Sequence, residues 1–143
     1  MANILRNVLA VVAGLVIGGA VNMALIMVSP YVVAPPAGAD VTTTEGLQKS
    51  LHLFQPQHFI MPFLAHALGT LVGAFVAALI AVGNKMRFAF VIGFFFLIGG
   101  ISAVKMLPAP MWFNITDLAL AYLPMAWLGF KLSELVSARN QQG

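Results

Sequence analysis

Charged residues are absent from two long stretches of this chain. None occurs between Arg6 and Asp40, and none occurs between Lys49 and Lys85. Each stretch has room for an apolar helix of about 20 residues, the length that crosses a hydrocarbon core about 30 Å thick. A third apolar run, from Phe88 to Val104, follows closely. The pattern therefore predicts helices that cross a lipid bilayer.

We expect an all-α membrane protein: a four-transmembrane-helix bundle that forms one integral membrane domain over residues 1–143. The predicted spans cover about residues 6–29, 60–83, 88–107 and 112–135. Pro124 lies inside the fourth span, where it leaves the carbonyl of Leu120 without its helical donor. We therefore expect a kink at this point.

The segment between the first two spans is the longest one outside the predicted membrane region. Thr42 and Glu45 have the spacing of a capping box, in which the first residue caps a helix. Leu47, Leu51 and Phe54 follow on one helical face, and Pro56 ends the pattern. We expect a short amphipathic helix in this loop, lying on the membrane surface or over the end of the bundle.

Composition narrows the class of protein further. The chain is 61% hydrophobic and 8% charged, whereas a soluble domain needs about a quarter of its residues charged. Intrinsic disorder requires the opposite composition, poor in apolar residues. A net charge of +3 without a dense basic patch excludes a nucleic-acid surface, and the absence of cysteine excludes disulfides and thiolate metal sites. The expected surroundings are the lipid bilayer.

Basic residues indicate the orientation of the four predicted spans. Five of them fall on the side of the termini, namely Arg6, Lys85, Arg87, Lys131 and Arg139. Only Lys49 and Lys105 fall on the other side. By the positive-inside rule both termini are expected in the cytoplasm. A cleaved signal peptide is the alternative for the first span, but its apolar run is longer than the signal core of about 7 to 15 residues.

Small residues predict how the helices pack, because lipid offers no hydrophobic drive for association. Gly14 and Gly18 form one G-x-x-x-G motif, and Gly69 and Gly73 form another. Such motifs let two helix backbones approach closely. They fit packing within one chain, and they also fit a homodimer face.

Few polar residues fall inside the predicted spans, and each is a candidate for function because polar groups are costly in lipid. Asn22, His66, Lys105 and Asp117 all fall in the outer half of the membrane or at its edge. They form a candidate polar cluster. Asp117 has three interpretations: a first-turn acid in a helix capped by Asn114, an interhelical clasp with His66 or Lys105, and a proton or ion site.

Metal binding is a further chemical hypothesis. His52, His58 and Met61 are the candidate ligands near the outer side, and imidazole with thioether suits copper. Their spacing matches no metal motif, and methionine is also a common filler of apolar cores. The sequence indicates no cofactor.

The C-terminal third carries a resemblance to a family. Met106-Leu-Pro-Ala-Pro-Met-Trp-Phe113, followed by Tyr122-Leu-Pro-Met-Ala126 and Gly129, resembles the end of small four-span bacterial inner-membrane proteins of unknown function. That family has Pro-His-Pro before Trp-Phe, whereas this chain has Pro108-Ala-Pro110. The resemblance implies a bacterial inner membrane and no particular activity.

Three functions remain open at this point. The first is a structural or accessory subunit that packs inside the bilayer, against itself or in a larger complex. The second is a small homo-oligomeric transporter or channel that uses the outer polar cluster. The third is a copper-handling protein or a membrane enzyme.

Overall fold

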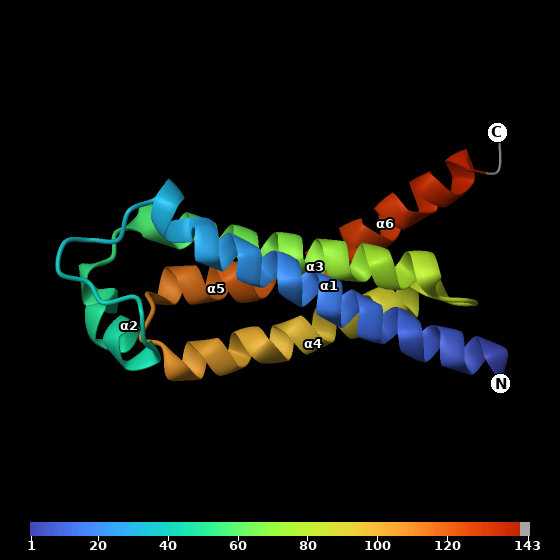
Figure 1. The fold of residues 1–143 in the computed structure, drawn as a ribbon, viewed down its shortest axis with the longest axis horizontal. Coiled ribbons are helices and arrows are strands. Elements are labelled where there is room, and N and C mark those ends of the chain that lie inside the picture. Colours follow the sequence, from blue (N-terminus) through green and yellow to red (C-terminus); the bar gives the residue numbers. More distant parts are fainter. Residues whose placement is uncertain (141–143) are drawn as a thin grey trace.

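The computed structural model describes residues 1–140, and every regular element in this range is a helix (Figure 1). Helices α1, α3, α4 and α5 precede the C-terminal helix α6, and three short helical pieces lie between α1 and α3. The elements are α1 (Ala2–Val32), α2 (Thr44–Ser50), η1 (Leu51–Leu53), η2 (Pro56–Phe59), α3 (Ile60–Ile80), α4 (Lys85–Met106), α5 (Met111–Leu120) and α6 (Leu123–Arg139).

Three helical segments are long and apolar enough to cross a membrane: α1, α4 and the segment Pro56–Ile80 that contains α3. This indicates a helical membrane protein. The observed ends differ slightly from the predicted ones. α1 continues through Pro30 to Val32, and α3 ends at Ile80, three residues before the predicted limit.

The predicted fourth span is not a single kinked helix. It consists of α5, with 10 residues, and α6, with 17 residues, separated at Ala121 and Tyr122. Pro124 lies in the first turn of α6, where the missing N–H would have no helical acceptor in any case. The prediction of a kink within one continuous helix was therefore wrong, because the chain ends one helix and starts another at this point.

The cap predicted for this segment was also wrong. α5 begins at Met111 after Pro110, so Asn114 lies in the first turn of the helix instead of capping it. Its side-chain Nδ2 donates a hydrogen bond to the carbonyl of Ala109 at 3.3 Å. Asp117 is consequently one turn further inside the helix than a first-turn acid would be.

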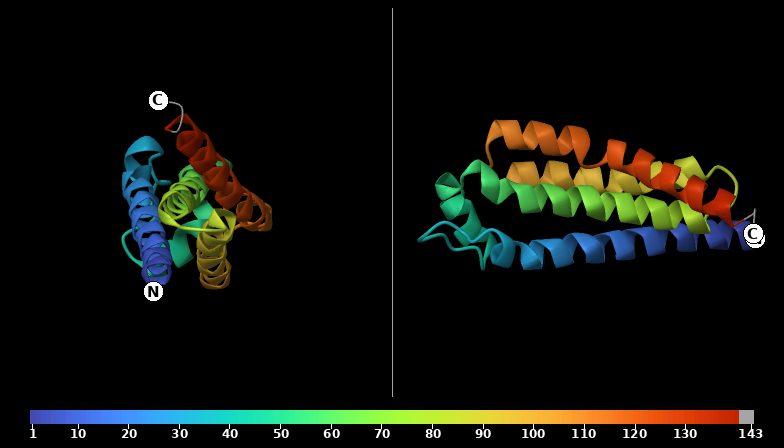
Figure 2. Two further views of the ribbon diagram at one scale, coloured as in Figure 1. Left: turned by 90° about the vertical axis from the view of Figure 1, so that its right-hand side faces the viewer. Right: turned by 90° about the horizontal axis from the view of Figure 1, so that it is seen from above.

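Helix α3 is the centre of the bundle and packs against α1, α4 and α6 (Figure 2). Between α1 and α3 the backbones nearly touch. A Cβ atom added to Gly14 would lie 2.7 Å from the carbonyl oxygen of Gly73, and one added to Gly18 would lie 2.6 Å from that of Gly69. The two G-x-x-x-G motifs therefore face each other within one chain.

On its other side α3 packs against α4 and α6 through small side chains. Six fully buried residues form this core: Ala74, Ala77, Ala78, Ala89, Ile92 and Ala126. Phe90, Phe96 and Phe130 pack around them. Alanines at the centre bring the helices close, and the phenylalanines fill the space around them.

The segment between α1 and α3 forms a cap over one end of the bundle, which we call the loop end. Its helix α2 is capped by Thr43, one residue later than predicted, and the Thr43 hydroxyl accepts a hydrogen bond from the N–H of Gly46. Leu47, Leu51 and Phe54 pack together with Phe59 and Phe113. The predicted apolar stripe thus covers the bundle.

Polar contacts hold the cap in place. The side chain of Gln48 donates to the carbonyl of Met106 at the end of α4, with a distance of 2.6 Å. The hydroxyl and N–H of Thr42 donate hydrogen bonds to Asp40 and hold the pKa of the Asp40 carboxyl below the usual range.

The start of α1 and the end of α6 lie at the opposite end of the molecule from α2 (Figure 2).

Candidate functional site

Asp117 is a nearly fully buried acid, with 3% of its surface exposed. One carboxylate oxygen lies 2.9 Å from Nδ1 of His66 on α3, and the other lies 3.0 Å from the same nitrogen. The hydroxyl of Tyr122 donates to Asp117 Oδ2 at 2.8 Å. Of the three interpretations of Asp117, the structure contains the interhelical contact with His66.

Each partner is positioned by the fold around it. Tyr122 is 2% exposed, and its ring is inclined by 28° to the His66 ring, with 5.9 Å between the centroids. Tyr122 occupies the break between α5 and α6, and its hydroxyl faces Gly100 of α4, where a Cβ atom would collide with it. The glycine therefore leaves the room that the tyrosine hydroxyl needs beside Asp117.

His66 presents its second ring nitrogen to open space. Its Nδ1 is used by Asp117, and no hydrogen bond within residues 1–140 involves Nε2. Nε2 is also not a fully buried unpaired atom, because Asn22 Oδ1 is the only such side-chain atom in the described part of the chain. Nε2 is thus available to a partner that the protein itself does not supply.

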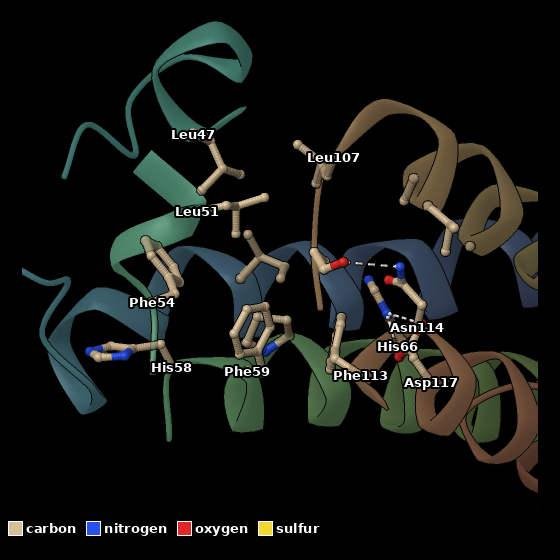
Figure 3. A pocket seen from close by; sticks show the side chains of 16 residues that line it. Leu47, Leu51, Phe54, His58, Phe59, His66, Leu107, Phe113, Asn114 and Asp117 are labelled. Carbon is tan, nitrogen blue, oxygen red and sulfur yellow. Dashed lines mark hydrogen bonds and ion pairs between the residues drawn. The ribbon is translucent and has the colours of Figure 1, made fainter. Parts of the chain in front are cut away.

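That open space is a cavity of about 170 Å³ at the loop end. Figure 3 shows Asp117 and His66 at its inner end and the cap residues Leu47 and Leu51 at the other. Its walls are mostly apolar. Besides the cap, His66 and Asp117, they come from Ile26, Pro62, Gly100, Ala103, Val104, Leu107, Ala109, Phe113 and the polar Asn114. A buried acid paired with a partly buried imidazole at the end of an apolar cavity is an arrangement found in small-molecule sites.

A second cavity, also of about 170 Å³, adjoins the first beneath the cap. The two share five lining residues, namely Ile26, Leu47, Phe54, His58 and Pro62. The second cavity continues toward the end of α1, where Ser29, Val33 and Val41 line it. The two cavities therefore lie on either side of the same residues beneath the cap.

The other two members of the predicted polar cluster do not join Asp117. Lys105 is exposed in the last turn of α4 and makes no ion pair or side-chain hydrogen bond with any described residue. Asn22 lies beside Gly69, one turn of α3 away from His66. Its unpaired Oδ1 is buried between α1 and α3.

The three metal candidates differ in burial and in their contacts. His52 is exposed on η1, and Met61 is buried in α3. Nδ1 of His58 accepts a hydrogen bond from the N–H of Gln55 at 2.9 Å. Within the described residues, no three His, Asp or Glu side chains are grouped to hold a metal ion.

Tyr122 is the site residue that the sequence did not reveal. In a continuous helix, each residue turns by about 100°, so a residue five positions after Asp117 would point about 140° away from it. The break after Leu120 removes that constraint and turns Tyr122 back toward the acid.

Comparison of the chain with protein-family models, curated proteins and solved structures finds no match.

Proposed function

We propose that the chain crosses a bacterial inner membrane four times, with both termini in the cytoplasm and the loop end outside. Two observations support a fourth crossing. α5 and α6 together contain 27 residues, and the end of α6 returns to the end of the bundle where α1 begins (Figure 2). The excess of basic residues at that end supports the orientation.

Within this frame, the protein acts as a binding protein for a small, mainly apolar molecule taken from the outer half of the membrane. The observation that carries this proposal is the Asp117–His66 pair at the inner end of an apolar cavity. Placing an ionisable group inside a membrane costs free energy, so a pair of such groups at a cavity indicates a function. An apolar cavity of about 150 Å³ binds benzene, which sets the size of the group that fits here.

Binding of a ring-sized probe tests this function directly. Protein in lipid nanodiscs is exposed to fluorobenzene, and saturation transfer from protein to probe is measured by fluorine NMR. Ala103→Leu fills the cavity and should abolish the protein-specific signal. Ala24→Leu is the matched control, because Ala24 is exposed on α1 and does not line the cavity. Equal signals from the two variants would show that the probe resides only in lipid.

An accessory-subunit role is the second candidate, and it rests on the exposed face of α4. Apart from the adjacent residues and the backbone of α4 itself, no described atom lies within 4 Å of the position that a Cβ of Gly99 would take, and Phe94, Phe95 and Ile98 nearby are exposed. A glycine on such a face allows another helix to approach closely. Native mass spectrometry should then detect an oligomer or a larger complex that Gly99→Leu disrupts. A monomer for both proteins would contradict this role.

A further inference from the structure

We infer that the ligand of the first cavity carries a flat aromatic ring, which the protein selects over a saturated ring of similar size. The inference rests on the proposed binding function and specifies its ligand class. The feature behind it is a row of three phenylalanine rings that line the cavity, Phe54, Phe59 and Phe113. We call these three residues the aromatic row.

The aromatic row brings together three parts of the fold. Phe54 follows η1, Phe59 ends η2, and Phe113 lies in the first turn of α5. The centroid of the Phe59 ring lies 6.0 Å from that of Phe54 and 4.8 Å from that of Phe113, with interplanar angles of 60° and 40°. In Figure 3 the three side chains lie below Leu51 and Leu107, which also line the cavity. The rings therefore form one aromatic wall of the cavity.

The wall on the side of α4 has a different character. The residues that line the cavity there are small or aliphatic, namely Gly100, Ala103, Val104 and Leu107. They limit the size of the ligand and offer no aromatic contact. Selectivity for an aromatic ligand must therefore come from the aromatic row and from the imidazoles of His58 and His66, which line the cavity as well.

Aromatic rings attract one another beyond their hydrophobic burial. The face of a ring is negative and its edge is positive, so edge-to-face and offset-stacked pairs are favoured. Because the rings of the aromatic row are tilted against one another, a flat ligand ring beside Phe59 or Phe113 can meet an edge or a face. A saturated ring lacks this charge distribution and gains only burial and dispersion. The preference does not depend on where the Asp117–His66 pair carries its protons.

The volume of the cavity sets the number of rings. The cavity holds about 170 Å³, and an apolar cavity of about 150 Å³ binds benzene. One six-membered aromatic ring therefore fills it, and benzene is the simplest probe of the ligand class. Cyclopentane has a similar volume and no π system, so the two compounds differ mainly in aromatic character.

Competition against fluorobenzene measures the preference. Benzene and cyclopentane displace bound fluorobenzene from the protein in nanodiscs, and the loss of fluorine saturation transfer gives each dissociation constant. Concentrations in the bilayer are measured in protein-free nanodiscs, so that differences in partition into lipid are removed. Benzene should bind about fivefold more tightly than cyclopentane, as expected for favourable pairs of aromatic rings.

Two leucine variants assign the preference to the aromatic row. Phe113→Leu removes one ring and keeps an apolar side chain, so the ratio of the two dissociation constants should fall to about twofold or less while cyclopentane still binds. Phe63→Leu is the matched control, because Phe63 packs against the same apolar cluster and does not line the first cavity. It should leave the ratio at about fivefold. Equal ratios in the two variants would overturn the assignment to the aromatic row.

The position of the bound ring has its own readout. Nuclear Overhauser effects are measured from benzene to ¹³C-labelled phenylalanine rings in otherwise deuterated protein. They should include the ring of Phe113, identified by the loss of its signals in Phe113→Leu. Effects confined to Phe94 and Phe95, which are exposed on α4, would place benzene outside the cavity and overturn the inference.

The outcomes separate this inference from the binding function on which it rests. If cyclopentane displaces the probe as well as benzene does, or if neither compound displaces it, the inference fails and the binding function stands. If fluorobenzene gives no protein-specific signal to displace, the binding function fails as well.

Discussion

Asp117 is expected to contribute to folding as well as to binding, because its partners belong to other elements of the fold. His66 comes from α3 and Tyr122 from the junction of α5 and α6. Asp117→Asn keeps the shape but replaces one carboxyl oxygen with an NH₂ group, which leaves a buried group imperfectly paired with His66 and Tyr122. We expect the free energy of unfolding to fall by about 1 to 3 kcal/mol. Unfolding in mixed detergent micelles, followed by circular dichroism, measures this change.

Two further substitutions define the scale of that effect. Tyr122→Phe removes only the hydroxyl bonded to Asp117, so a smaller loss of about 1 kcal/mol is expected. Glu134→Gln removes an exposed acid paired with Lys131, for which a change within about 0.5 kcal/mol is expected. If Asp117→Asn were as mild as Glu134→Gln, the acid would be hydrated instead of clasped between helices.

The contact between α1 and α3 depends on glycine at specific positions. A Cβ atom on Gly73 would lie 2.7 Å from the carbonyl oxygen of Gly14, and a backbone oxygen cannot move aside without shifting a helix. Gly73→Ala should therefore lower the free energy of unfolding by about 1 to 3 kcal/mol. The same measurement in detergent micelles tests it.

Gly99→Ala provides the matched control for that helix contact. Gly99 is also inside a helix, but nothing lies near the position of its Cβ. Replacing it should be neutral or stabilise the protein by up to about 1 kcal/mol, since alanine is the better helix former. Equal destabilisation by both substitutions would mean that helix propensity, and not the close contact, governs the effect.

Helices α1, α3 and α4 could be predicted from charge-free stretches because lipid requires apolar side chains around each helix. The division of the last predicted span could not. Residues on both sides of the break are apolar, so hydropathy is the same for one helix or two. At the break, the buried hydroxyl of Tyr122 bonds to Asp117, a contact that has no signature in the hydropathy pattern.

The candidate site shows the same division between local pattern and tertiary contact. His66 and Asp117 could be proposed as partners because both are polar residues at similar depth in predicted helices. Lys105, at the end of the third predicted span, was proposed as an alternative partner of Asp117, yet it is exposed at the end of α4. Depth along a helix follows from counting residues, whereas the direction of a side chain depends on how the helices are rotated against one another.

The number of membrane crossings can be decided by the side on which the end of α6 lies. The chain contains no cysteine, so single cysteines introduced at exposed positions report their own side. We expect Thr44→Cys to react with an impermeant maleimide from outside, and Met86→Cys to react only after the membrane is opened.

Asn140→Cys distinguishes a topology of four crossings from one of three. Four crossings return it to the side of Met86, whereas three crossings, with α5 and α6 left outside, would expose it together with Thr44. Reaction of Asn140→Cys in intact cells would therefore contradict the four-span proposal. It would also require a new account of why the apolar faces of α5 and α6, with Ile115, Leu120 and Trp127 exposed, face water.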